Sequence, residues 1–143
     1  SRLRMTSLYY YSGIHNYLVA GTGNKVEDFG IGFFTKYGDG GVDISPIADL
    51  TKTEVYQIAR HLNINNEIIT ADPTDGLWGE ERTDEEQIGA SYAELEWAMN
   101  FKGDALNIES RKKEVLQIFT RLNSINQHKM TPIPVCVIPE NIK

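Results

Sequence analysis

The sequence predicts an α/β protein in which helices outnumber strands. Several segments carry helix signals, whereas Tyr17–Gly21, "YLVAG", is a short apolar run of the kind found in buried strands. A Gly/Thr/Asn turn follows this run, and the carboxyl ends of strands in open α/β sheets are where such proteins bind ligands. A second extended piece, Val42–Leu50, is interrupted by Pro46. Because two strands do not form a stable open sheet, we expect further strands to come from other sequence or from a partner chain.

Capping boxes predict where three helices begin. Thr51–Glu54, Thr83–Glu86 and Ser91–Glu94 each place Glu three residues after Ser or Thr, so that side chain and backbone can cap each other. The first box leads into an amphipathic stripe typical of a surface helix. The stripe consists of Val55, Ile58, Ala59 and Leu62.

Helices are also expected at the beginning of the chain and before its last segment. The first should span about Arg2 to Tyr11, with Gly13 as its stop signal. Ser110 should cap the last helix, and the tail after it contains three prolines and should be extended. The residues expected to face inward on the last helix are Val115, Ile118, Phe119, Leu122 and Ile125.

Composition indicates one ordinary globular domain. The 143 residues suffice for one core, and 41% apolar with 24% charged residues is normal globular usage. A net charge of -6 without a basic run argues against a nucleic-acid-binding surface. No apolar run has the length of a membrane span, so a cytoplasmic protein is the simplest interpretation. The single cysteine, Cys136, excludes an internal disulfide and is expected to be a buried, inert thiol.

The stretch Gly32–Asp43, "GFFTKYGDGGVD", has no helix or strand period. Its four glycines allow the backbone to approach a ligand closely, and Lys36 supplies a cation. The aromatic rings of Phe33, Phe34 and Tyr37 either line a site for a flat ring or pack into the core around a hairpin turn.

Two residues after the first predicted strand are candidates for nucleotide and metal binding. A threonine at a strand end, Thr22, can bond a phosphate or a base. Glu27 can hold a hard cation, since Mg²⁺ often takes one or two carboxylates and completes its shell with phosphates and water. Alternatively, Thr22 is a helix cap and Glu27 a solvated residue of the first turn.

Three further positions have a binding and a structural interpretation. Lys52 lies in the first turn of its helix, where a cation is unfavourable unless an anion such as phosphate is present; otherwise it is a solvated lysine. Thr74 and Trp78 belong to the long irregular stretch 71–82, which either closes over a ligand or docks its Trp on the core. His128–Lys129 either binds a ligand or ends a helix.

Taken together, these stretches resemble the C-terminal half of an ammonia-dependent NAD synthetase. The similar strings span nearly the whole chain in the order of the family, and the longest of them contains the glycine-rich stretch. They are "RLRM", "GTGNKVEDF", "GFFTKYGDGGVDISPIADLTKTEVY", "PTDGLW", "RTDEEQIGASY" and the "HK" near the end.

The resemblance implies a partial adenine-nucleotide alpha-hydrolase-like (ATP-pyrophosphatase) fold, mostly helical with few parallel strands, in a homodimer. It also implies a ligase reaction with Mg²⁺: ATP adenylates deamido-NAD with release of pyrophosphate, and ammonia converts the acyl-adenylate to NAD and AMP. The glycine-rich stretch resembles the segment of the family that embraces the dinucleotide.

The resemblance also assigns binding roles to individual residues. Thr22, Lys52 and Thr74 would contact ATP, and Glu27 would be a magnesium ligand. Arg4 is an alternative to Arg2 as the arginine that contacts deamido-NAD. The residues expected to contact deamido-NAD are Arg2, Lys36, Asp43, His128 and Lys129.

The sequence departs from the family pattern in two places. Gly23-Asn24 stands where many relatives have Asp-His, which affects the fine contacts to ATP. The family's N-terminal "SGGxDS" pyrophosphate loop is absent, so we expect residues 1–143 to be the C-terminal portion of one synthetase domain and inactive by themselves. One alternative is a non-catalytic dimerisation and dinucleotide-binding module. Another is a different ATP-pyrophosphatase such as GMP synthetase, although the string "FFTKYGDGG" does not resemble the substrate region of that family.

Overall fold

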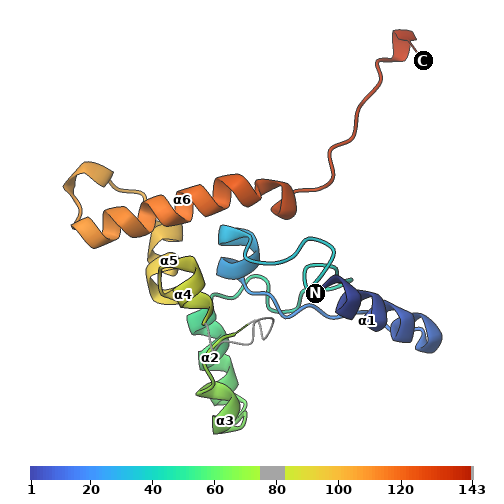
Figure 1. The fold of residues 1–143 in the computed structure, drawn as a ribbon, viewed down its shortest axis with the longest axis horizontal. Helices are drawn as coiled ribbons and strands as arrows, with labels where there is room; N and C mark the ends of the chain where they lie inside the picture. The colour runs from blue at the N-terminus through green and yellow to red at the C-terminus, as the bar shows by residue number, and fades with distance from the viewer. Residues whose placement is uncertain (75–82, 143) are drawn as a thin grey trace.

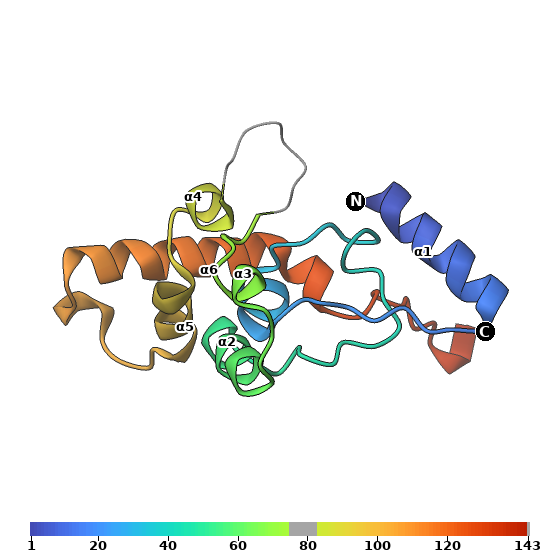
Figure 2. The ribbon, with the colours of Figure 1, turned by 90° about the horizontal axis from the view of Figure 1, so that it is seen from below.

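The computed structural model describes residues 1–74 and 83–142, and the regular secondary structure in these segments is all helical. The long helix α6 packs across α5 and the short π-helix η1, while α2 and α3 extend to one side (Figure 1). Helix α1 lies apart from these elements in both views (Figure 2). The helices are α1 Arg2–His15, η1 Lys25–Ile31, α2 Lys52–His61, α3 Asn66–Ile69, α4 Asp84–Ile88, α5 Tyr92–Asn100, η2 Ala105–Asn107, α6 Ser110–Met130 and η3 Glu140–Ile142.

The predicted strand Tyr17–Gly21 is wrong as a strand. Within residues 1–74 and 83–142 the chain has no strand, only an isolated parallel bridge between Ala20 and Ile44. The bridge is flanked by two hydrogen bonds, Gly21 N to Ile44 O at 2.7 Å and Asp43 N to Val19 O at 2.9 Å. The two extended segments therefore run side by side in the parallel sense expected, but two short pieces without further strands do not build a sheet.

All three predicted capping boxes are confirmed. In each, the Ser or Thr hydroxyl accepts a hydrogen bond from the Glu backbone N–H, and the Glu carboxylate accepts one from the cap N–H. The distances from cap N to carboxylate oxygen are 2.8 Å at Thr51, 3.0 Å at Thr83 and 2.8 Å at Ser91. These contacts join residues three apart, which is why the sequence pattern located α2, α4 and α5.

The ends of the first and last helices differ from the prediction. Helix α1 continues through Gly13 and ends at His15, where Asn16 adopts a left-handed conformation with φ 55°. One exposed glycine inside a helix costs only about 1 kcal/mol, which the neighbouring turns outweigh. Helix α6 begins at Ser110, so the N-cap is Glu109, one residue earlier than expected.

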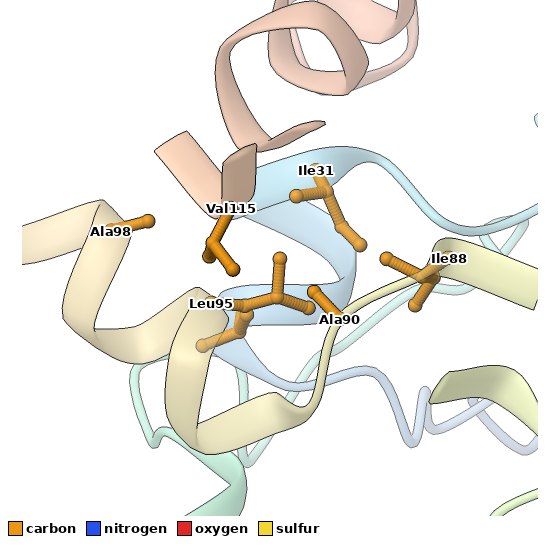
Figure 3. Packing of buried hydrophobic residues seen from close by; sticks show 7 residues of the cluster. Ile31, Ile88, Ala90, Leu95, Ala98 and Val115 are labelled. Carbon is orange, nitrogen blue, oxygen red and sulfur yellow. The ribbon is translucent and has the colours of Figure 1, made fainter. Parts of the chain in front are cut away.

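The core lies where η1, α4, α5 and α6 meet (Figure 3). Leu95, Val26 and Ile31 are completely buried, and Val115 brings α6 onto them. The full buried cluster is Val26, Ile31, Ile88, Ala90, Leu95, Ala98 and Val115.

Helix α6 contributes most of its predicted inner face to this core. Ile118, Phe119 and Leu122 are partly buried against the cluster, as expected. Ile125 is 57% exposed, so that part of the prediction is wrong. The helix runs past the end of the core there, and its last turns meet the loop after η1 instead.

A bidentate ion pair joins α6 to the beginning of α5. Arg111 places Nε 2.7 Å and Nη2 2.9 Å from the two carboxylate oxygens of Glu94, and Nη2 also donates to the Gly89 carbonyl at 3.1 Å. The hydrogen bond from Arg111 is the main cause that lowers the pKa of Glu94 to about 2, with further help from the Ser91 backbone. Glu94 therefore stays charged and can serve the capping box and the ion pair together.

Much apolar surface lies outside the core. The chain exposes 10317 Å², compared with about 7,400 Å² for a compact monomer of its mass. Helix α1 buries no residue, and the segment after α6 extends away from the other helices (Figure 1). Cys136 lies in that extended segment and is exposed, so the expected burial of its thiol is wrong. No helix among the described residues is both long enough and apolar enough to cross a bilayer.

Replacing Leu95 by alanine should test where the core lies. Leu95 is completely buried between η1 and α6, so truncation should lower the free energy of unfolding by about 2–5 kcal/mol. Urea unfolding followed by circular dichroism measures the change. Leu106→Ala is the matched control, because Leu106 is 79% exposed and should unfold like the parent chain. Equal effects of the two substitutions would contradict this location of the core.

Candidate functional site

The helix η1 positions the centre of the candidate site. Asn24 is buried, and its Oδ1 accepts hydrogen bonds from the backbone N–H groups of Val26 and Glu27, both at 3.0 Å. Lys25 N donates to Leu50 O at 2.8 Å, which fixes η1 against the segment before α2. From the sequence, Asn24 was expected only to be a departure from the family pattern. Its cap role had a readable signal, since Asn is among the strongest N-cap residues and acidic residues follow in the first turn.

Glu27 joins three helices at this site. Its Oε1 lies 3.0 Å from Lys52 Nζ at the beginning of α2 and 2.5 Å from the hydroxyl oxygen of Tyr92 at the beginning of α5. The Lys52 and Glu27 side chains are only 20% and 15% exposed, so this ion pair is poorly screened by solvent. The ammonium also lies 4.8 Å from the centre of the Tyr92 ring. Glu27 and Lys52 were predicted from the sequence, whereas Tyr92 was not, because no local pattern marks it.

Tyr92 acts as a neutral hydrogen-bond donor between two carboxylates. Its hydroxyl oxygen also lies 3.3 Å from Oδ2 of the buried Asp84. Burial raises the pKa of Tyr92, and the charges of Glu27 and Asp84 raise it further. The hydroxyl therefore keeps its proton and can stabilise the Glu27 carboxylate.

Asp28 adds a second acidic group beside Glu27. Burial is the main cause that raises the pKa of Asp28 to about 6, followed by the charges of Glu27 and Asp39. A Cβ atom added at Gly23 would lie 1.9 Å from an Asp28 carboxylate oxygen. The departure at Gly23 thus has a steric reason, because the Asp28 carboxylate occupies the space of a side chain there.

Two lysines tie the glycine-rich stretch to the end of α6. Lys129 Nζ donates to the carbonyl oxygens of Gly32 at 2.9 Å and Phe34 at 2.8 Å, while Lys36 Nζ donates in the opposite direction to the His128 carbonyl. Desolvation lowers the pKa of Lys129. The structure therefore brings together the three predicted deamido-NAD residues Lys36, His128 and Lys129.

Arg2 and Asp43 attach α1 to the same region. Arg2 Nε donates to the Lys36 carbonyl at 3.3 Å. Asp43 accepts from the Tyr9 hydroxyl at 3.0 Å and from Val19 N at 2.8 Å. Four of the five predicted dinucleotide contacts therefore interact with one another or with the same loop, and Asp43 lies at the far end of it. Arg4, the competitor of Arg2, is exposed on α1.

The two threonines predicted to contact ATP take no part in the described hydrogen-bond networks around Glu27 and the glycine-rich stretch. Thr22 and Thr74 are both exposed, and neither side chain makes a hydrogen bond to another described residue. Trp78 lies outside the described residues.

The aromatic residues of the glycine-rich stretch divide between the two interpretations. Phe33 is partly buried against the core, which fits the structural alternative. Phe34 packs on Gly40, where an added Cβ would lie 2.3 Å from the ring, and Lys129 Nζ lies 5.5 Å from its centre. Tyr37 has φ 61° and is 52% exposed, the most exposed of the three rings, and Lys36 Nζ lies 5.6 Å from its centre.

Comparison with known proteins agrees with the sequence motifs. The model of the NAD synthase family matches residues 1–133. The NH(3)-dependent NAD(+) synthetase of Carboxydothermus hydrogenoformans is 46% identical over 129 residues, which cover 90% of this chain and 49% of the relative. The enzyme of the same name from Archaeoglobus fulgidus is 46% identical over 134 residues, covering 92% and 52%.

Solved structures give the same relationship. The NMN synthetase from Francisella tularensis superposes with a TM-score of 0.80 at 30% identity, covering 97% of this chain and 53% of that chain. The NH3-dependent NAD synthetase from Campylobacter jejuni, in complex with nitrate, gives a TM-score of 0.60 at 28% identity, covering 95% and 52%. This chain thus spans about half the length of the relatives that it matches. Its sequence and its structure together show that it belongs to the NAD synthase family.

Proposed function

We propose that the whole protein makes NAD from deamido-NAD, ATP and ammonia. The observation that carries this proposal is the similarity to NH(3)-dependent NAD(+) synthetases at 46% identity over about nine-tenths of the chain. The Glu27–Lys52 pair and the loop held by Lys36 and Lys129 support it, since they supply a charged centre and a second, separate group of cations.

The proposed reaction has two steps. A carboxylate oxygen of the nicotinate group attacks the α-phosphorus of ATP, and pyrophosphate leaves. Ammonia then attacks the acyl carbon, AMP leaves with the bonding electrons, and the nitrogen loses a proton as the amide forms. The nicotinate carboxyl must therefore reach the α-phosphate, so the two substrates have to be bound side by side.

At the ATP end, Lys52 is the residue best placed to hold phosphate. Its ammonium group lies at the beginning of α2, where the helix dipole also favours an anion. The N–H groups of Thr53 and Glu54 there are already bound by Glu96 and by the Thr51 cap. Lys52 is paired with Glu27 and can exchange part of this contact for a phosphate oxygen. Thr22 and Thr74 are exposed, and their hydroxyl groups would donate to the nucleotide.

The donor set fits Mg²⁺ held through a single protein carboxylate. Among the described residues no three acidic, His or Cys side chains converge into a metal site. Glu27 is a hard oxygen ligand whose Oε1 is oriented by Lys52 and Tyr92, and Mg²⁺ commonly takes one or two carboxylates with phosphates and water. Glu27 would hold the ion, which when bound supplies charge neutralisation to the phosphates.

At the dinucleotide end, the residues around the glycine-rich stretch would contact deamido-NAD. Lys36 and Lys129 each donate to backbone carbonyls here, and an ammonium group can turn one of its three donors to a substrate phosphate or carboxylate. Arg2 uses only Nε in its contact to the loop, which leaves the rest of its guanidinium for the substrate. Asp43 would accept from ribose hydroxyls, and His128 lies beside Lys129 at the end of α6.

We also propose that the whole protein is a cytoplasmic homodimer. The accessible surface exceeds that of a compact monomer by about 2,900 Å², which is more than the roughly 1,600 Å² buried in a standard protein interface. Helix α1 contributes to this excess with the exposed side chains of Leu3, Leu8, Tyr10 and Tyr11. A second copy, together with the remaining sequence of the whole protein, would cover these residues.

The function is tested by incubating the whole protein with ATP, Mg²⁺, deamido-NAD and ammonium. We expect NAD, AMP and pyrophosphate to form in equal amounts. Nicotinate mononucleotide in place of deamido-NAD tests the second candidate, NMN synthesis, which the superposition on the Francisella tularensis enzyme favours. Binding of deamido-NAD without turnover of either substrate would show a non-catalytic binding module instead.

Glu27→Gln should weaken the use of Mg²⁺ in the whole protein. The substitution keeps the size of the side chain and removes the anionic ligand, so the Mg²⁺ concentration for half-maximal pyrophosphate release should rise on the order of tenfold or more. Binding of deamido-NAD, measured calorimetrically, should stay within twofold. Glu67→Gln on the exposed helix α3 is the matched control. An unchanged Mg²⁺ dependence would remove Glu27 from the metal site.

Lys36→Ala should act on deamido-NAD and not on ATP. The loss of one charged hydrogen bond costs about 1.5–3 kcal/mol, so KM for deamido-NAD should rise roughly ten- to hundredfold. KM for ATP should change much less, because Lys52 lies at a different helix end. Lys113→Ala, on the exposed first turn of α6, is the control. A larger shift in KM for ATP would place Lys36 with Lys52 at the triphosphate.

A further inference from the structure

Three side chains on α6 donate hydrogen bonds to backbone carbonyls at the end of η1. Asn123, Asn126 and Lys129 follow one another at three-residue spacing and therefore lie along one side of the helix. The amide of Asn123 donates to the Gly30 carbonyl at 2.7 Å, and that of Asn126 donates to the Ile31 carbonyl at 2.9 Å. Lys129 continues the series at the carbonyls of Gly32 and Phe34.

These carbonyls need donors from outside their own helix. The last carbonyls of any helix have no partner within it, and η1 ends at Ile31. Gly30, Ile31 and Gly32 are buried, and a buried carbonyl without a hydrogen bond is costly. Asn123 and Asn126 therefore cap the carbonyl groups at the end of η1, as Asn24 caps the N–H groups at its beginning.

The contact is close enough to fix the backbone sterically. A Cβ added at Gly32 would lie 2.6 Å from Asn126 Cβ, and one at Gly30 would lie 3.3 Å from the ring of Phe119. Gly32 also has φ 62°, a conformation that favours glycine. The chain turns at this residue, directly under α6, and enters the glycine-rich stretch that carries Lys36.

We propose that Asn123 and Asn126 are positioning residues that set the glycine-rich stretch, and through it Lys36, for the dinucleotide substrate. This inference rests on the proposed function for its substrate, but its structural part does not depend on it. Both amides bind the backbone at the end of η1, and they act on the substrate only through the loop that begins there. Lys36 is four residues beyond Gly32 and returns to the His128 carbonyl, so the segment 32–36 is tied to α6 at both of its ends.

Asn123→Asp and Asn126→Asp test the proposal in the whole protein. Each change keeps the size of the side chain but replaces the N–H donor with a carboxylate oxygen facing a carbonyl. Each should raise KM for deamido-NAD at least about fivefold, the effect of one neutral hydrogen bond, while KM for ATP and kcat stay within twofold. Asn126→Ala, which removes the donor without adding charge, should show the same split and serves if an aspartate variant does not fold.

Hydrogen exchange provides a readout that needs no turnover. Without substrates, the backbone amides of residues 33–38 should exchange at least fivefold faster in the variants, and those of α5 should not change. Asn100→Asp is the matched control, because the Asn100 amide also donates to a backbone carbonyl, that of Glu96 at 2.9 Å, but lies far from the loop in sequence. It should leave both KM values and the loop amides unchanged.

The outcomes separate this inference from the proposed function. If residues 33–38 exchange faster in the variants but the parent protein makes no NAD, the asparagines position the loop and the proposed function is wrong. Unchanged exchange and unchanged KM for deamido-NAD in an active enzyme would overturn the positioning role. Equal rises in both KM values, with faster exchange throughout the chain, would overturn it as well, because they would show a general loss of stability.

Discussion

The burial of one short helix, η1, is the constraint on which the rest of the structure depends. Val26, Gly30 and Ile31 are buried, so the backbone at both ends of η1 enters the core together with its polar groups. Both ends of such a helix must find hydrogen-bond partners in the protein. Asn24 supplies them at the beginning, and α6 supplies them at the end. The position of Glu27 and the course of the glycine-rich stretch both follow from this fixed segment.

Local signals let the sequence predict much of the helical fold. The capping boxes join residues three apart, and the sequence alone located the three helices that they start. The prediction was wrong where the outcome depends on distant residues. Tyr17–Gly21 has the composition of a strand but forms only one bridge, from Ala20 to Ile44. Ile125 continues the apolar helical pattern of α6 but lies past the end of the core and is exposed. Composition alone cannot show where a core ends.

The candidate site divides in the same way. The sequence and its resemblance to the family selected Glu27 and Lys52, 25 residues apart, and the structure pairs them. They did not select Tyr92, which is 65 residues from Glu27, or the asparagines of α6, which contact backbone more than 90 residues away. A substrate contact leaves a motif of residue types, whereas a side chain that binds a distant carbonyl can be of several types. Such supporting contacts become visible only when the fold is known.

The contacts within the protein also bear on how the two substrates of the proposed reaction would share one site. Lys52 is paired with Glu27. Lys129 donates to the Gly32 carbonyl after η1, and Lys36 donates to the His128 carbonyl on α6. Pairing with protein groups keeps these cations in place without an anionic ligand. Lys52 contacts the first turn of η1 through Glu27, whereas Lys129 contacts the carbonyls just after its end. In the proposed reaction, a phosphate bound by Lys52 would act on the beginning of η1 through Glu27, whereas a dinucleotide bound by Lys129 would act on its end. Because the Phe33 N–H donates to the Glu27 carbonyl at 2.8 Å, the two ends are joined by backbone as well. A rigid η1, held at both ends by asparagine side chains, would therefore keep the two groups of cations at a fixed separation, which is what a reaction between a carboxylate and an α-phosphate requires.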